Sequence, residues 1–143
     1  GMGKTSLCAE FLKQAKKTVP GLVCLTGQCV EQYGSSESYL PFLNAFSRSL
    51  ESPARSFLEP ALISHAPAWS IQFTSTFATS DIRAQLRQET MGATPERMLR
   101  EMGEYLSALA RKKTIVLLLE DLHWADASSL NLVRYLGHLI GQM

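Results

Sequence analysis

The chain has 143 residues, of which 45% are hydrophobic and 19% charged, and its formal net charge is +1. This length and composition suit one domain with a real hydrophobic core. The near-neutral charge gives no electrostatic reason to expect nucleic-acid binding by this segment. No apolar stretch approaches the roughly 20 residues of a membrane span. We therefore expect a cytoplasmic protein that contacts neither nucleic acid nor membrane directly.

The first six residues, Gly-Met-Gly-Lys-Thr-Ser, match the second half of a phosphate-binding P-loop. Gly1 and Gly3 lack a Cβ, so the backbone there can direct N–H groups at phosphate oxygens. Lys4 would reach the β and γ phosphates, Thr5 would ligate Mg²⁺, and Ser6 would complete the loop. The alternative is a glycine-rich start of a helix that carries an ordinary surface lysine.

The leading glycine of a P-loop, and the strand before it, would precede residue 1. We therefore expect residues 1–143 to be one partial domain, an internal piece of a longer protein that begins inside this loop. Residues 4–17 follow with apolar side chains at helical spacing, which predicts a helix with one buried face. The residues of that face are Leu7, Cys8, Phe11, Leu12 and Ala15.

Residues 22–26 predict a short strand, and Gly27 is expected at its exit. In the next element, Tyr39, Leu43, Phe46 and Leu50 are spaced four, three and four, which predicts an amphipathic helix. Pro41 fits the first turn of that helix. The three cysteines of the chain have no metal-ligand spacing, so reduced structural thiols are expected at Cys8, Cys24 and Cys29.

Residues 53–90 keep no single period and contain three prolines, so short helices and loops are expected there. From Thr94 the pattern is clear: Thr94 fits an N-cap and Pro95 the first helical position. An apolar stripe then predicts a helix with a core-facing side. Its members are Met98, Leu99, Met102, Tyr105, Leu106 and Leu109.

Residues 115–119 are five consecutive apolar residues followed by Glu120 and Asp121. Such a run predicts a strand buried on both faces of a parallel sheet, and ligands of open α/β sheets bind at the carboxyl ends of the strands. We interpret the run as a Walker B strand, in which one carboxylate serves the Mg²⁺ shell and the other orients or deprotonates the attacking water. The alternative is a buried strand followed by a helix-capping acid.

The turn after this strand contains His123 and Trp124. His123 would either sense the nucleotide state or, as we favour, pack as a scaffold residue, and Trp124 is expected to anchor the turn. Asp126 fits the N-cap of a last helix. The side chains expected to face inward on that helix are Leu130, Val133, Leu136 and Ile140.

These segments together resemble the ATPase module of STAND-type signalling proteins, the AAA-like P-loop ATPases of large bacterial transcriptional regulators and some multidomain cyclases and kinases. The resemblance covers nearly the whole chain and is carried by residues 28–34, 39–41, 92–101 and 120–126. It implies an α/β fold with a truncated parallel-sheet core of the P-loop NTPase type and a helical insertion between the second and third strands. Later strands of such sheets would follow residue 143.

Residue by residue, the resemblance implies phosphate and Mg²⁺ binding by Gly1, Gly3, Lys4 and Thr5, and Walker B roles for Glu120 and Asp121. The order of the two carboxylates departs from the family pattern, which has Asp first and an acidic residue second. Glu120 would therefore serve the metal shell together with Thr5, and Asp121 would serve the water. A slow hydrolase that acts as a timed switch is consistent with this order.

The sequence thus predicts ATP binding and slow Mg²⁺-dependent hydrolysis that control an output domain in the same chain, DNA-binding or cyclase in type. Nucleotide-dependent self-association is a further expectation. One alternative is an adaptor that binds nucleotide without hydrolysis. Another is a P-loop small-molecule kinase, which the lack of a compact arginine-rich lid disfavours. We expect residues 1–143 alone to bind ATP poorly, because about two strands are few for a stable sheet.

Overall fold

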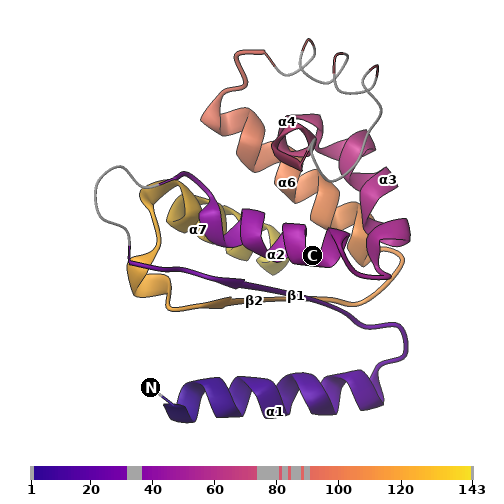
Figure 1. The fold of residues 1–143 in the computed structure, drawn as a ribbon, viewed down its shortest axis with the longest axis vertical. Coiled ribbons are helices and arrows are strands. Elements are labelled where there is room, and N and C mark those ends of the chain that lie inside the picture. Colours follow the sequence, from indigo (N-terminus) through magenta and orange to yellow (C-terminus); the bar gives the residue numbers. More distant parts are fainter. Residues whose placement is uncertain are drawn as a thin grey trace.

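A computed structural model describes residues 2–31, 37–73, 81, 84, 88 and 91–142. Gly1, residues 32–36 and most of residues 74–90 lie outside this description. The described elements, in chain order, are α1 (Met2–Thr18), β1 (Val23–Gln28), α2 (Leu40–Leu50), α3 (Arg55–His65), α4 (Pro67–Ser70), η1 (Ile71–Phe73), α6 (Pro95–Ala110), β2 (Ile115–Glu120), η2 (Leu122–Trp124) and α7 (Ala127–Gly141) (Figure 1).

Strands β1 and β2 form a parallel pair, in register from Val23 opposite Ile115 to Gln28 opposite Glu120. Parallel strands need a crossover connection, and here the connection is made of helices. Both strands therefore end at the same edge of the sheet. The predicted α/β class and the two predicted parallel strands are confirmed.

Gly27 lies inside β1 and not at its exit, so the prediction for this glycine was wrong. A Cβ at Gly27 would stand 2.0 Å from the carbonyl oxygen of Pro41 and 3.3 Å from the Cβ of Ala45. The glycine thus allows the first turn of α2 to lie directly on the strand. A glycine after a run of strand residues is typical both of a turn and of a strand on which another backbone packs closely. The sequence alone did not distinguish the two.

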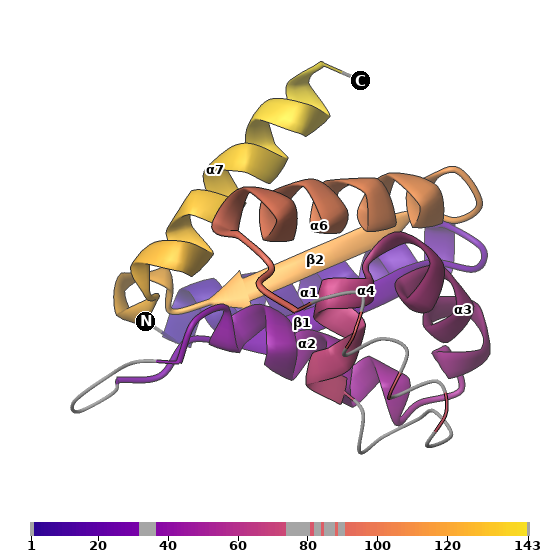
Figure 2. The same cartoon turned by 90° about the horizontal axis from the view of Figure 1, so that it is seen from above.

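The core lies between the sheet and the helices on one side of it (Figure 1). Alternate residues Val23 and Leu25 of β1 are buried, as expected for a strand with one packed face. Helix α2 supplies Phe42 and Phe46, and the predicted helix over residues 39–50 is confirmed apart from Tyr39, which is its N-cap. Helices α3, α4 and α6 form a further layer above α2, seen from above in Figure 2.

Helix α1 lies on the opposite side of the sheet from α2, apart from the other helices (Figure 1). Its predicted buried face was wrong in part within the described structure: Cys8, Leu12 and Ala15 are half-buried, but Leu7 is 72% and Phe11 60% exposed. The helix predicted over residues 4–17 is confirmed, since α1 spans Met2–Thr18. Burial depends on what covers the face, and no described element covers these two side chains.

The described part of the segment after α2 folds into short helices, as predicted. Helix α3 runs for 11 residues and contains Pro60. Pro60 removes one backbone donor, but packing of Leu58 and Leu62 into the core holds the helix together. Trp69 of α4 is also buried, and its Nε1 donates to the carbonyl of Met98 at 2.9 Å.

Two predicted helix starts are confirmed by their caps. The hydroxyl of Thr94 accepts from the N–H of Arg97 at 3.2 Å, and Asp126 Oδ2 accepts from the N–H of Ser129 at 2.9 Å. The stripe on α6 is confirmed, with Met102, Tyr105 and Leu109 buried. The predicted face of α7 was partly wrong, because Leu132 and Leu136 are buried while Ile140 is 69% exposed.

Strand β2 is only half-buried along its length, so the prediction of burial on both faces was wrong for the described structure. Among the described residues, β2 pairs with β1 alone. An apolar hollow of 550 Å³ runs along it between α6 and α7. None of the helices in the described part of the chain is both long and apolar enough to cross a bilayer.

Candidate functional site

The predicted phosphate-binding residues lie in the first turns of α1. Gly3, Lys4, Thr5 and Ser6 are all within Met2–Thr18, and Gly1 lies outside the described residues. The first turn carries no acidic side chain, so nothing there opposes an anion at the positive end of the helix dipole. A Cβ at Gly3 would meet nothing within 4 Å, so the backbone is open to a ligand.

The two predicted catalytic carboxylates lie at the carboxyl end of β2. Glu120 is the last residue of the strand, and its carbonyl accepts from the N–H of Cys29 at 3.0 Å. Asp121 follows in the left-handed conformation, with φ 58° and ψ 47°. This conformation is tolerated by aspartate, and it turns the chain sharply so that η2 begins at once. Glu120 thus has the extended backbone of a strand, whereas Asp121 has a left-handed backbone.

Gln28 is a site residue that the sequence did not reveal. It is the last residue of β1, opposite Glu120 in the register, and its Nε2 donates to Asp121 Oδ2 at 3.1 Å. The bond joins the ends of the two strands across a sequence separation of 93 residues. Gln28 belongs to one of the segments that carry the family resemblance, but a role for it at the site follows only once the strand pairing is known.

The amino-terminal end of α1 and the carboxyl ends of the strands lie at the same end of the molecule in two perpendicular views (Figures 1 and 2). The two predicted halves of the site thus face the same edge of the sheet. Within the described residues, no hydrogen bond or ion pair joins Lys4 or Thr5 to Glu120 or Asp121.

The turn after the carboxylates differs from the prediction. His123 is exposed and Trp124 is 45% exposed, so neither is a packed scaffold residue or a buried anchor. Their rings lie 4.8 Å apart at an angle of 45° and pack on one another. The turn is short and is stabilised by backbone hydrogen bonds, including one from the N–H of Trp124 to the carbonyl of Asp121 at 3.0 Å. The side chains of His123 and Trp124 lie at the surface.

Asp126 has a second role that its N-cap position did not indicate. Besides capping α7, its Oδ2 accepts from the backbone N–H of Tyr39 at 3.2 Å. Tyr39 has φ 64° and ψ 20° and begins α2, so the bond ties the loop after β1 to the loop after β2. Burial, and next the negative charge of Asp126, raise the pKa of the Tyr39 phenol.

Cys29 follows Gln28 and is buried, and all three cysteines of the chain are free thiols. Burial raises the pKa of the Cys29 thiol, and the negative charges of Asp126 and Asp121 raise it further. The protonated thiol is a poor nucleophile. Cys29 therefore fits the structural role predicted for it.

No group of three or more His, Cys, Asp or Glu side chains gathers into a metal site within the described residues. Mg²⁺ in nucleotide sites generally keeps several waters and takes one or two protein ligands plus phosphate oxygens. Thr5 and Glu120, one from each half of the site, provide a hydroxyl and a carboxylate of the required hard-oxygen type.

Comparisons with curated proteins and with solved structures gave no significant match. A family model described as "AAA ATPase domain" matches residues 1–142, which is nearly the whole chain. The match includes the start of α1 and the end of β2, where the predicted nucleotide-binding residues lie. On the strength of this match, the chain belongs to the AAA ATPase domain family.

Proposed function

We propose that the protein binds ATP with Mg²⁺ at the edge of the sheet between α1 and β2, and hydrolyses it slowly as a regulatory switch. The single observation that carries this proposal is that the start of α1 and the carboxyl end of β2 lie at the same end of the molecule in both views (Figures 1 and 2). Membership of an ATPase family supports the nucleotide as the ligand. The helices between β1 and β2 are proposed as an insertion into the family fold.

In this proposal the start of α1 holds the phosphates. The N–H groups of its first turn point at the phosphate oxygens, and Lys4 adds charge to the β and γ phosphates. Gly1 and Gly3 allow the close approach of the backbone. Ser6 continues the turn. These residues provide binding and orientation, which supply most of the rate enhancement in phosphoryl transfer.

The carboxylates take different parts. Asp121 orients the attacking water and accepts its proton while the bond between the γ-phosphorus and the leaving oxygen breaks. The amide of Gln28, which donates to Asp121 Oδ2 at 3.1 Å, would help to orient the carboxylate. Glu120 and Thr5 would hold Mg²⁺, which when bound neutralises charge on the phosphates. This order places the longer side chain of Glu120 at the metal and the shorter side chain of Asp121 at the attacking water. The exchange is consistent with slow turnover.

Slow hydrolysis suits a switch in which nucleotide state controls an attached output domain. We propose that this domain lies in the same polypeptide, with DNA binding or cyclase activity as its class, and that the STAND type describes the whole protein. Self-association in the ATP-bound state, and a cytoplasmic location, belong to the same proposal. The switch element would be the loops after β1 and β2, whose described parts are joined by the hydrogen bond from Tyr39 to Asp126.

Phosphate release from the full-length protein with MgATP tests the proposal. The wild type should release phosphate slowly, and Asp121→Asn should bind MgATP with similar affinity but lose most of the release. Binding without release in the wild type would favour the nucleotide-binding adaptor instead. Release that requires a small-molecule acceptor would favour the kinase.

A further inference from the structure

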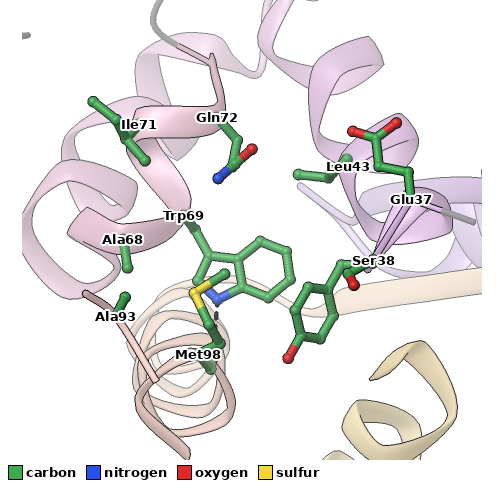
Figure 3. Close-up of a pocket in the computed structure, with 10 residues that line it drawn as sticks. Glu37, Ser38, Leu43, Ala68, Trp69, Ile71, Gln72, Ala93 and Met98 are labelled. Atoms are coloured by element: carbon green, nitrogen blue, oxygen red, sulfur yellow. Dashed lines mark hydrogen bonds between the residues drawn. The ribbon is translucent and has the colours of Figure 1, made fainter. Parts of the chain in front are cut away.

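Helix α6 lies beside a different hollow at each of its ends. The cavity at its start, of 360 Å³, has no lysine, arginine or histidine among its ten lining residues, all of which are described. Trp69 is buried there and donates to the carbonyl of Met98 (Figure 3), so the protein itself covers the indole. The hollow at its end, of 540 Å³, is lined by Arg111, Lys112 and His65 and, among its ten described lining residues, by no carboxylate. Its charge favours an anionic occupant.

This second hollow is an open groove between α3 and the end of α6. Pro60 and Ser64 of α3 are exposed in it, as are Arg111 and Lys112 after α6. Its volume is within the range of binding sites in proteins. The apolar side chains that line it and remain partly accessible are Phe57, Ala61 and Ala108. The groove therefore combines accessible apolar surface with exposed positive charge.

The lysine that follows these two basic residues adds a third positive charge beside the apolar lining. Lys113 is exposed, and its Nζ lies 4.6 Å from the centroid of the Phe57 ring, which is a cation–π contact. Such a contact favours one position of the ammonium group. A ligand that packs on the apolar lining would therefore meet positive charge next to it.

Nearby carboxylates do not neutralise this charge. Glu59 of α3 pairs with Arg55 at 2.6 Å, and Glu104 of α6 lies 4.0 Å from Arg100. No ion pair engages Lys112 within the part of the chain that the structure describes. Cations at the end of a helix also interact favourably with its dipole, but the dipole does not account for the apolar groove beside them.

The groove lies away from the candidate ATP site. Lys113 comes before β2 and Glu120 is the last residue of this strand, which has six residues and is thus about 20 Å long. Figures 1 and 2 both show the turn between α6 and β2 at the far end of the molecule from the start of α1. Occupancy of the groove therefore leaves the ATP site open, and the proposed ATPase function is not needed for it.

We propose that this groove is a docking site for an acidic peptide segment of a partner protein, with an aliphatic or aromatic side chain as its anchor. Carboxylates of the segment pair with Arg111 and Lys112, and the anchor contacts the exposed part of Phe57. Charge complementarity selects the acidic segment. The apolar lining favours a peptide over a small inorganic anion, which would contact the cations alone.

Calorimetric titration of the full-length protein with three synthetic peptides tests this site. The acidic probe is acetyl-Asp-Glu-Leu-Phe-Glu-Asp-amide; a second probe has Ser-Ser in place of Leu-Phe, and a third has lysine in place of each acidic residue. We expect saturable binding of the acidic probe, and at least about tenfold weaker binding of the serine probe because the apolar contact is lost. The lysine probe should bind most weakly. Equal affinities of the acidic and serine probes, or tightest binding by the lysine probe, would overturn the proposal.

Ser64→Glu and Ser64→Gln form a matched pair at an exposed position of the groove, since the two new side chains differ in charge and hardly in size. Ser64→Glu should weaken binding of the acidic probe about two- to fivefold, and Ser64→Gln should bind as the wild type does. Equal affinities of the two variants would place the probe elsewhere. Matching circular dichroism and melting temperatures establish that both variants fold.

A charge reversal tests the basic side of the groove independently. Lys112→Glu should weaken the acidic probe about fivefold, whereas Lys13→Glu, at an exposed lysine on the opposite side of the sheet, should not. Raising the salt concentration from about 0.1 M to about 1 M should weaken binding to the wild type at least about threefold. Equal effects of the two reversals would overturn the site.

Two other occupants would give different results. If the protein sediments as a dimer that Lys112→Glu dissociates and Lys13→Glu does not, while no peptide binds, a second copy of the chain occupies the groove and the proposal is wrong. Binding to phosphatidylserine vesicles without binding of the acidic probe would equally overturn it.

Discussion

The side-chain amide of Gln28 donates to the carboxylate of Asp121 at 3.1 Å, and this bond connects the last residue of β1 to the residue after β2. Because hydrogen bonds are directional, the amide of Gln28 favours one orientation of the Asp121 carboxylate at the edge of the sheet. The same edge faces the start of α1. In the proposed mechanism, the orientation of the water therefore depends on a residue of the neighbouring strand.

Replacing Gln28 should change catalysis more than binding. Gln28→Leu keeps the approximate length of the side chain but removes the donor, so Asp121 loses its fixed angle. We expect kcat for ATP hydrolysis to fall about tenfold, as part of the contribution of a positioned general base is lost. The KM for ATP should stay near the wild-type value. Gln14→Leu, at an exposed glutamine of α1, is the matched control; an equal effect of both variants would remove the positioning role.

Gly27→Ala should destabilise the fold. The added Cβ would stand 2.0 Å from the backbone oxygen of Pro41, which cannot move without displacing α2. We expect a loss of about 3 kcal/mol in the free energy of unfolding. Gly137→Ala in α7 is the matched control, since its Cβ would meet nothing within 4 Å and alanine favours helix by about 0.5–1 kcal/mol. Urea unfolding of both variants measures the difference, and a neutral Gly27→Ala would refute the close packing.

The buried phenol of Tyr105 predicts a loss of stability at alkaline pH. Burial raises the pKa of Tyr105 above its ordinary value. Because the pKa is higher in the folded state, the protonated phenol stabilises the fold fully below the unfolded-state pKa of about 10. This stabilisation is lost as the pH rises toward the folded-state pKa. Above pH 10 the free energy of unfolding should therefore fall more steeply in the wild type than in Tyr105→Phe. Parallel slopes in urea titrations from pH 9 to 11 would contradict this.

The Cys29 thiol should become more reactive when a neighbouring carboxylate is neutralised. Its pKa is raised by burial first and by Asp126 and Asp121 next, so Asp126→Asn should lower the pKa and increase the thiolate fraction. Asparagine still caps α7. In a background lacking Cys8 and Cys24, the rate of alkylation against pH should shift to lower pH. A uniform change in rate with the midpoint unchanged would indicate altered access instead.

Much of the fold could be predicted because its signals are local. Thr94 and Asp126 cap helices through backbone groups three residues away, and a run of five apolar residues marks the strand before Glu120. The predicted phosphate-binding residues and the acidic pair were likewise contained in short segments. Local interactions of this kind depend little on the rest of the structure.

The errors concern contacts that sequence spacing does not encode. Spacing showed that Leu7 and Phe11 share a helix face, but burial of that face depends on the partner element. The bond from Gln28 to Asp121, and that from Tyr39 to Asp126, join residues 93 and 87 positions apart. The glycine at position 27 was compatible with a turn, which we predicted, and with close packing against Pro41, which the structure shows. Such features follow only once the strand register and the helix positions are known.

The central claim is that the start of α1 and the end of β2 bind one nucleotide between them. The most direct test is calorimetric titration of MgATP into the full-length protein, its Lys4→Ala variant and the control Lys13→Ala, which removes an exposed lysine farther along the same helix. The account predicts binding by the wild type and by Lys13→Ala, and a loss of at least about a hundredfold in Lys4→Ala, because charge-assisted hydrogen bonds to phosphate disappear. Undiminished MgATP affinity in Lys4→Ala would contradict it.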